Sequence, residues 1–334
     1  MLTSVSTHSE LMHHYTTVMY QLGARDAVVH LWRFYIPQQA FKHSFLLHGL
    51  LAFTALHLAY LKPHDSPRYL SLGDKHQAIA LESFQSILSS NADPDPDMAD
   101  ALFALSATLS LSSMARSCAL SANTTMNMDD IAELFIMTKG IQNMIRLSSE
   151  HIRRGPMATM LEYQTRPEGT ETELPLPVSV HFEALRQILV MYGLDPEALE
   201  DCQSALTQLE EIYKNIIDFA PVVDIEIGDI SRWQVHVSMG YVRLIQVRNQ
   251  PALIILAYYA AAITAIHTAW YIHNWAEYAL RGISQSLNNS MQHLIEWPLE
   301  QLQNKMSELG VRSTVDASTL DHTFATLGLA TRSV

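Results

Sequence analysis

The sequence predicts an all-α fold, and three observations lead to that prediction. Apolar residues recur every three or four positions along most of the chain, capping residues stand where these runs begin, and the alternating pattern of a half-buried strand is nearly absent. Hydrophobic residues make up 48% of the 334 residues and charged residues only 16%, below the quarter or so typical of globular domains. Such a chain must bury much of its surface, and we expect one multi-helix domain over residues 1–334.

Capping residues and proline define the helices expected in the first half of the chain. Thr7 and Glu10 have the spacing of a capping box, so a helix should run from there to about Gly23. A second helix over 26–35 should stop near Pro37, because proline has no amide donor and clashes with the preceding turn. Further helices are expected at residues 43–61, 66–89, 98–115 and 128–147, the first of them apolar on every side and therefore central.

The second half continues the helical pattern after one loop. Residues 166–177 are dense in Pro, Gly, Thr and Glu, and we interpret them as a surface loop within the domain, because helical patterns continue on both sides. Asp195 and Pro196 begin a strongly amphipathic helix. Later helices are expected at residues 234–247, 252–267, 269–283 and 291–309.

The charge balance argues against one large class of partner. Lys and Arg total 21 against 34 acidic residues, which gives a formal net charge of −13. A surface of that sign repels phosphate backbones, so direct binding of nucleic acid is not expected.

Cysteine usage and the hydropathy pattern indicate an intracellular protein without a membrane span. The two cysteines, Cys118 and Cys202, have neither metal-binding nor redox spacing, and the N-terminus lacks the blocks of a secretory signal. Residues 249–276 contain no Asp, Glu, Lys or Arg, yet Thr, His and Asn interrupt the run. Polar side chains at that density fit a buried helix pair better than a helix in lipid.

One motif resembles a metal site. Asp129, Asp130 and Glu133 form a DDxxE, similar to the magnesium-binding carboxylates of class I terpene cyclases. Asn127 precedes them as a cap, however, so both aspartates fall in a first helical turn, where they favour the helix dipole. The helix-start interpretation is preferred, and no later metal motif supports the other.

The histidines and the absent motifs lead to the same expectation of no metal and no cofactor. None of the 16 histidines has an HExxH spacing, and His48 and His57 lie on opposite faces of one expected helix. We expect these two as buried side chains bonded to neighbouring carbonyls. There is no GxSxG elbow, glycine-rich phosphate loop or kinase motif, which argues against hydrolase, nucleotide-binding and dehydrogenase chemistry.

Several short segments resemble the C-terminal regulatory domain of fungal sterol-uptake-control transcription factors. These segments are 10–16, 40–52, 55–59, 75–77, 101–106, 251–260 and 297–298. The resemblance implies an all-helical fold enclosing a sterol-sized hydrophobic pocket. Those regulators carry an N-terminal six-cysteine zinc cluster that contacts DNA, and no such cluster stands in this sequence. Asn274 also departs from the family pattern, which usually has glycine there.

A polar stripe in the uncharged region supplies the candidate site. Thr264, His267, Tyr271 and Asn274 are three, four and three residues apart, so on a continuous helix they share one face. They could orient one oxygen of an apolar ligand, with His267 and Tyr271 as catalytic residues, or form a buried network between helices. The candidate ligand-binding residues are Trp233, His236, Met239, Tyr258, Tyr259, Thr264, Trp270 and Asn274.

Two functions are expected. In the first, the chain is a stand-alone protein of fungal secondary metabolism that folds a terpenoid-like substrate for a metal-independent cyclisation, with a Diels–Alder reaction as one form. This function is favoured because Met1 begins directly at the region of resemblance. In the second, the chain is the sterol-sensing domain of a transcription regulator. Either function implies a hydrophobic small molecule as partner, and a homodimer is left open. The protein is expected in the cytoplasm, or in the nucleus if it is the regulator.

Overall fold

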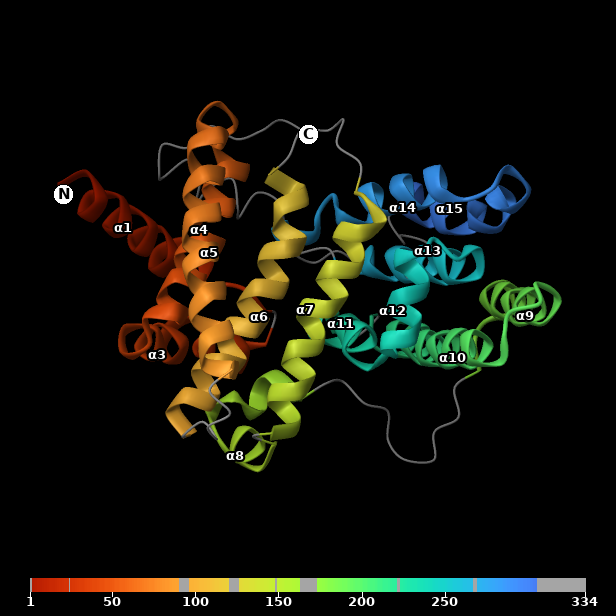
Figure 1. Ribbon diagram of the computed structural model, residues 1–334, viewed down its shortest axis with the longest axis horizontal. Helices are drawn as coiled ribbons and strands as arrows, with labels where there is room; N and C mark the ends of the chain where they lie inside the picture. Colours follow the sequence, from red (N-terminus) through yellow and green to blue (C-terminus); the bar gives the residue numbers. More distant parts are fainter. Residues whose placement is uncertain are drawn as a thin grey trace.

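Helices form almost all of the structure. The computed structural model describes residues 2–23, 25–89, 96–119, 126–147, 149–162, 173–220, 223–266 and 269–304. Within these ranges there are fifteen α-helices and no strand, which confirms the predicted all-α class (Figure 1). One large hydrophobic cluster extends from Tyr15 in the first helical segment to Ile295 near the last.

The first helices differ from their predicted bounds. The capping box at Thr7 does not open a helix, because α1 (Leu2–His14) already begins at Leu2 and continues as a π-helical segment, Tyr15–Met19. After α2 (Asp26–His30) and a second π-helical segment (Leu31–Tyr35), the chain does not stop at proline but continues as α3 (Ile36–Lys42). Pro37 lies in the first turn of α3, a position that needs no amide donor.

The next four helices match the prediction closely and form the left-hand part of the molecule in Figure 1. They are α4 (Ser44–Leu61), α5 (Ser66–Ser89), α6 (Pro96–Ala119) and α7 (Met128–Leu147). The α4 helix is central as expected and packs against α5 and α6. Gly49 allows the close approach to α6, since a Cβ there would lie 2.5 Å from Leu105 Cδ1.

The remaining helices complete the second half. They are α8 (Ser149–Arg154), α9 (Leu176–Met191), α10 (Pro196–Phe219), α11 (Ile227–His236), α12 (Met239–Gln246), α13 (Gln250–Ile263), α14 (Trp275–Ser286) and α15 (Glu296–Asn304), with 3-10 segments at Pro156–Leu161, Trp270–Ile272 and Asn289–Ile295. The predicted helix 234–247 is two helices, because the chain is extended at Val237 and Ser238 caps α12. Of the expected loop 166–177, residues 166–172 lie outside the described residues and Leu176 already begins α9.

The α13 helix is the centre of the second half. All fourteen of its residues are buried, and it packs against α10, α14 and α15. Two other helices, α4 and the Asp97–Ala119 part of α6, are long and apolar enough to cross a membrane, but 72% and 78% of their apolar windows are buried inside the protein. Burial of this extent is what core helices of a large helical fold show.

The polar stripe expected over residues 264–274 does not lie on one helix. The α13 helix ends at Ile263, and the amides of Thr264, Ala265 and Ile266 bond three residues back, in a tight final turn. The β-branched residues crowded at this point disfavour a further helical turn. The chain becomes helical again only in the 3-10 turn at Trp270, so the expected continuity is wrong.

Candidate functional site

An apolar cavity lies where the N-terminal segment meets α6, α7 and α11. The cavity itself has a volume of about 120 Å³, and the empty space around it, including open solvent at its mouth, comes to about 870 Å³. Most of the wall is apolar and comes from four separate stretches of the chain: Leu22, Val28, Trp32, Phe103, Ala107, Leu111, Met114, Met160, Leu161, Ile227 and Val235. A concave, largely apolar site with a few polar groups is the usual form of a small-molecule pocket.

Helical periodicity places the two main walls. On α6 the lining positions run from Phe103 through Ala107 and Ser110 to Met114, so they share one face of that helix. On α11 the lining positions from Ile227 to Val235 repeat with the same spacing. The cavity is therefore bounded by one face of each helix, and the other faces pack into the core.

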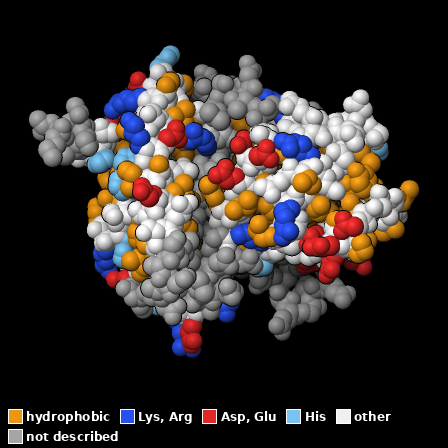
Figure 2. Space-filling view, in the orientation of Figure 1, with side chains coloured by type: hydrophobic (Ala, Val, Ile, Leu, Met, Phe, Trp, Pro, Cys, Tyr) orange, Lys and Arg blue, Asp and Glu red, His pale blue; other side chains and the backbone are white. Residues whose placement is uncertain are grey.

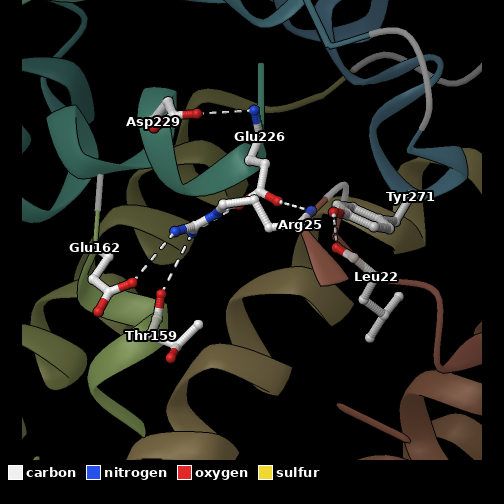
Figure 3. A network of polar contacts seen from close by, with 7 residues as sticks. All are labelled: Leu22, Arg25, Thr159, Glu162, Glu226, Asp229 and Tyr271. Carbon is white, nitrogen blue, oxygen red and sulfur yellow. Dashed lines mark hydrogen bonds and ion pairs between the residues drawn. The ribbon is translucent and has the colours of Figure 1, made fainter. Parts of the chain in front are cut away.

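A network of polar contacts around Arg25 holds one edge of the cavity (Figure 3). The backbone N–H of Arg25 donates to Glu226 Oε1 at 2.7 Å, and its Nε donates to Oε2 at 2.8 Å. Its Nη2 lies 2.8 Å from the same Oε2 and donates to the Thr159 carbonyl at 3.4 Å. Arg25 Nη1 lies 3.9 Å from Oε2 of Glu162, which is the exposed outer member of the network. The network ties the start of α2, the 3-10 segment and the start of α11 together.

Local sequence explains why Glu226 occupies this place. Glu226 is the N-cap of α11 and forms a capping box with Asp229, whose carboxylate accepts from the Glu226 amide at 3.0 Å. On the other side, Gly23 gives room for the approach, because a Cβ there would lie 2.6 Å from Val28 Cγ1 and 3.4 Å from Glu226 Oε1. The carboxylate is thus fixed by its own helix start before Arg25 binds it.

The electrostatics of the cavity favour an uncharged occupant. Glu226 is 7% exposed and Arg25 32% exposed, so the pair is largely removed from water. Among the described lining residues these two carry the only charges, and they neutralise each other. Bringing another charge into an apolar site without a partner costs several kcal/mol or more, whereas a neutral polar group can use spare hydrogen-bonding capacity.

Polar groups on the inner wall complete the site. Ser110 Oγ lies 3.4 Å from Thr138 Oγ1, across the gap between α6 and α7. Gln234 is 1% exposed, and neither its Nε2 nor the Tyr259 hydroxyl makes a hydrogen bond of acceptable geometry with the described residues. Burial raises the pKa of Tyr259 well above its usual value, and the Gln234 amide opposes that rise. The amide and the hydroxyl are therefore neighbours.

The predicted aromatic ligand-binding residues pack against other aromatic rings and do not line the cavity. The Trp233 ring stacks on Tyr259 with centroids 4.4 Å apart, and its Nε1 donates to the Ala205 carbonyl. Tyr258 stacks on Trp297 at 5.2 Å. Trp270 stacks on His57 at 4.4 Å. His236 and Met239 are exposed at the α11–α12 junction.

The described residues of the polar stripe do not bond to one another but have other partners or positions. Thr264 Oγ1 donates back to the Ala261 carbonyl, and the Tyr271 hydroxyl donates to the Leu22 carbonyl at 3.3 Å. Asn274 is the half-buried residue before α14. His267 lies outside the described residues. None of the nine described candidates is among the residues that line this cavity, although Tyr271 is bonded to the Leu22 backbone at its edge.

A second cavity lies between α5, α6, α7 and α14, and it is more polar. Asp74, Arg116, Asp130 and Glu133 are among its lining residues. Asp74 pairs with Arg116 at 2.5 Å. Asp130 is engaged at the start of α7, where its carboxylate accepts from the Asn127 amide, so the helix-start interpretation of the DDxxE is supported. Within the described residues no group of three or more His, Cys, Asp or Glu could hold a metal ion.

His57 is buried as predicted, His48 is only half-buried, and each bonds to another histidine. His57 Nδ1 lies 3.1 Å from His14 Nε2, and His48 Nδ1 lies 2.7 Å from His76 Nδ1. As predicted, His48 and His57 share no partner, but the expected carbonyl acceptors are wrong: the partners are imidazoles from α1 and α5. In each pair one ring must donate and the other accept, which requires at least one neutral ring.

Sequence reasoning missed Arg25 and Glu226. These residues are 201 positions apart, and no local pattern connects them. One signal was available in the sequence. Glu226 and Asp229 have capping-box spacing, which marks a helix start ahead of Gln234, where the predicted helix begins. A carboxylate at a buried helix start needs a donor or cation, which is the hint that the sequence contained.

Comparison with known proteins gives a local similarity. No known family model matches this chain. Sterol uptake control protein 2 of Saccharomyces cerevisiae is 44% identical over 52 residues, and the protein of the same name from Candida albicans is also 44% identical over 52 residues. The match covers 15% of this chain and only 6% and 7% of those two proteins. The similarity to these sterol-uptake proteins is therefore real but confined to a short segment.

Proposed function

We propose that this chain is a ligand-sensing regulatory domain that binds one uncharged apolar molecule, of sterol or terpenoid class, in the cavity between α6, α7 and α11. The observation that carries the proposal is the cavity itself, with apolar walls and an internally neutralised Arg25–Glu226 pair at its edge. The short similarity to sterol uptake control proteins supports a regulator over an enzyme.

The same network explains how a ligand could be sensed. Arg25 connects three segments that each contribute to the wall, so an occupant that moves any one of them changes the contacts of the other two. A ligand shifts a conformational equilibrium only by its difference in affinity for the two states. The Gln234 Nε2 offers one such difference, because it makes no hydrogen bond of ordinary geometry with the described residues and a ligand oxygen beside it would accept one.

Thermal shift with a cavity-filling variant tests the proposal. Ergosterol, cholesterol and geranylgeraniol are screened for a concentration-dependent rise in the Tm of the protein. We expect at least one of them to give such a rise. Ala107→Phe places a ring in the cavity and should abolish that rise. Ala78→Phe, on the exposed face of α5, is the matched control and should retain it. No rise with any compound, or an equal rise in Ala107→Phe, rejects the proposal.

A second candidate function is the metal-independent cyclisation of a terpenoid-like substrate in the same cavity. The observation that favours it is the set of neutral donors on the wall, Ser110, Ser231 and Gln234, which could polarise a substrate carbonyl. Incubation of a bound polyene followed by mass spectrometry and chromatography separates the two functions. A new isomer formed by chelator-treated protein supports cyclisation. Recovery of the unchanged ligand rejects cyclisation and favours the ligand-sensing function.

A further inference from the structure

The α9 helix has apolar residues on two faces, and the described residues cover only one of these faces. The inner face, Val178, Phe182, Leu185 and Leu189, is buried in the core. The outer face carries Leu176, Val180, Val190 and Met191, which are 57% to 84% exposed. A helix that is apolar all round is normally buried all round. Half of the surface that α9 offers for packing is therefore unused.

The exposed apolar residues are concentrated here rather than scattered. Of the twelve large apolar side chains that are exposed in the described residues, five fall between Leu176 and Tyr192. At about 100° per residue, Leu176, Val180, Val190 and Met191 lie within roughly a third of the helix circumference. Glu183 and Gln187 are exposed in the same sector, between the two apolar pairs. Isolated exposed apolar residues need no explanation, but this concentration of them on one helix face indicates an interaction surface.

Acidic residues accompany this apolar face. From residue 173 to residue 200 there are five acidic residues and one basic residue, Arg186. Arg186 is already paired with Glu210 of α10 and lies 3.6 Å from Glu183 on its own helix. Figure 2 shows apolar side chains and a group of acidic ones together on the right-hand edge of the molecule, where Figure 1 places α9 and α10. The surface is therefore apolar with a net-negative border.

We propose that the outer face of α9 is a docking surface for a helix of another protein whose apolar stripe is flanked by Lys or Arg. The charges decide the occupant. A second copy of this chain would bring Glu183 and the acidic residues of α10 against their own kind, and each copy carries a net charge of −13. A basic amphipathic helix instead covers the apolar face and complements its border.

Peptide binding tests this surface directly. The probe is an 18-residue helical peptide with Leu at the i, i+4, i+7 and i+11 positions and flanking Lys, compared with a peptide in which Glu replaces each Lys. Fluorescence anisotropy should show binding of the Lys peptide only, weaker at high salt because the border charges are screened. Val180→Gln with Met191→Gln should weaken binding at least tenfold. Val247→Gln, at an exposed apolar residue on another part of the surface, is the control and should bind normally.

The contradicting results are equally definite. Unchanged binding by the Val180→Gln, Met191→Gln protein, or equal binding of the Glu peptide, overturns the proposal. So does sedimentation velocity that finds dimers of the wild-type chain which the same two substitutions dissociate, because the occupant would then be a second copy. The substituted positions Val180, Met191 and Val247 are all exposed, so the variants should keep their fold. Melting temperatures equal to that of the wild type confirm that they do.

Discussion

The surroundings of α13 and the space between α6, α7 and α11 are both apolar, and the candidate cavity lies in the second. Around α13 large rings interlock: Trp233 stacks on Tyr259, and Trp275 meets the same tyrosine edge-on at 6.1 Å. The cavity wall is built mainly from Leu, Val and Met side chains of segments that are far apart in the sequence. The aromatic-rich, uncharged region is thus the filled core, and the cavity lies where the Arg25–Glu226 pair connects separate segments at its edge.

The largest expected effect comes from truncating the filled region. Trp233→Ala should lower the free energy of unfolding by about 3–5 kcal/mol, because the ring leaves a large void and the Ala205 carbonyl loses its donor. Met114→Ala at the cavity wall should cost less, about 2 kcal/mol, since Met114 already borders empty space. Urea unfolding of both variants measures the difference. Equal losses would mean that the cavity is closed in solution.

The ion pair at the cavity edge should give the next largest effect. Glu226→Gln should destabilise the protein by about 2 kcal/mol, less than for a fully buried pair because Arg25 is about a third exposed. Lys42→Ala, which breaks the exposed pair with Asp97, is the control and should cost no more than about 0.5 kcal/mol. If the two variants unfold at the same urea concentration, the network has no part in holding the cavity edge.

Much of this fold follows from local signals. The Asp195 side chain accepts from the Ala198 amide as its sequence position predicts. The bounds of α4, α5 and α7 follow from capping residues, proline and an apolar run. Predictions that depended on a single residue were less secure, since Pro37 begins a helix that it was expected to end.

The candidate site could not be predicted in the same way. Its wall joins residues from Leu22 to Val235, and its ion pair joins residues 201 positions apart, so no sequence window contains it. The polar stripe failed for a physical reason as well. Spacing places Thr264 and Asn274 on one face only if the helix is continuous, and the chain leaves the helix after Ile263.

Acid should separate stability from ligand binding, because the buried histidines lie away from the cavity. Burial lowers the pKa of His57 to about 3 and that of His14 to about 4, and burial likewise lowers the pKa of His76 to about 4. The unfolded chain, with an ordinary pKa near 6.5, then binds more protons than the folded one as the pH falls below about 6.5. Stability is therefore complete above that pH and declines toward pH 4.

The expected slope is at most about 1.4 kcal/mol per pH unit for each such histidine. Melting temperatures measured from pH 7.5 to pH 4.5 should fall, and His57→Phe should fall less steeply than wild type. No histidine is among the described residues that line the cavity, so ligand affinity should stay constant from pH 7.5 to pH 6. A melting temperature that does not change over the whole range would contradict the burial of these pairs.

The smallest expected effect is that of Tyr271→Phe. The Tyr271 hydroxyl makes a long bond of 3.3 Å to the Leu22 carbonyl, so its loss should cost about 1 kcal/mol and leave ligand affinity nearly unchanged. Thr138→Val, on the cavity wall, is the comparison that should alter affinity. Loss of binding or turnover in Tyr271→Phe at an unchanged melting temperature would restore Tyr271 as a ligand-facing residue.

Photoaffinity labelling tests the location of the ligand most directly. A sterol carrying a diazirine is bound, irradiated and mapped by peptide mass spectrometry, with excess unmodified sterol as competitor. Labels should appear on the cavity walls, in residues 103–114 of α6 and 227–235 of α11, and the competitor should remove them. Competed labels confined to residues 252–275 would place the ligand around α13 and contradict the account.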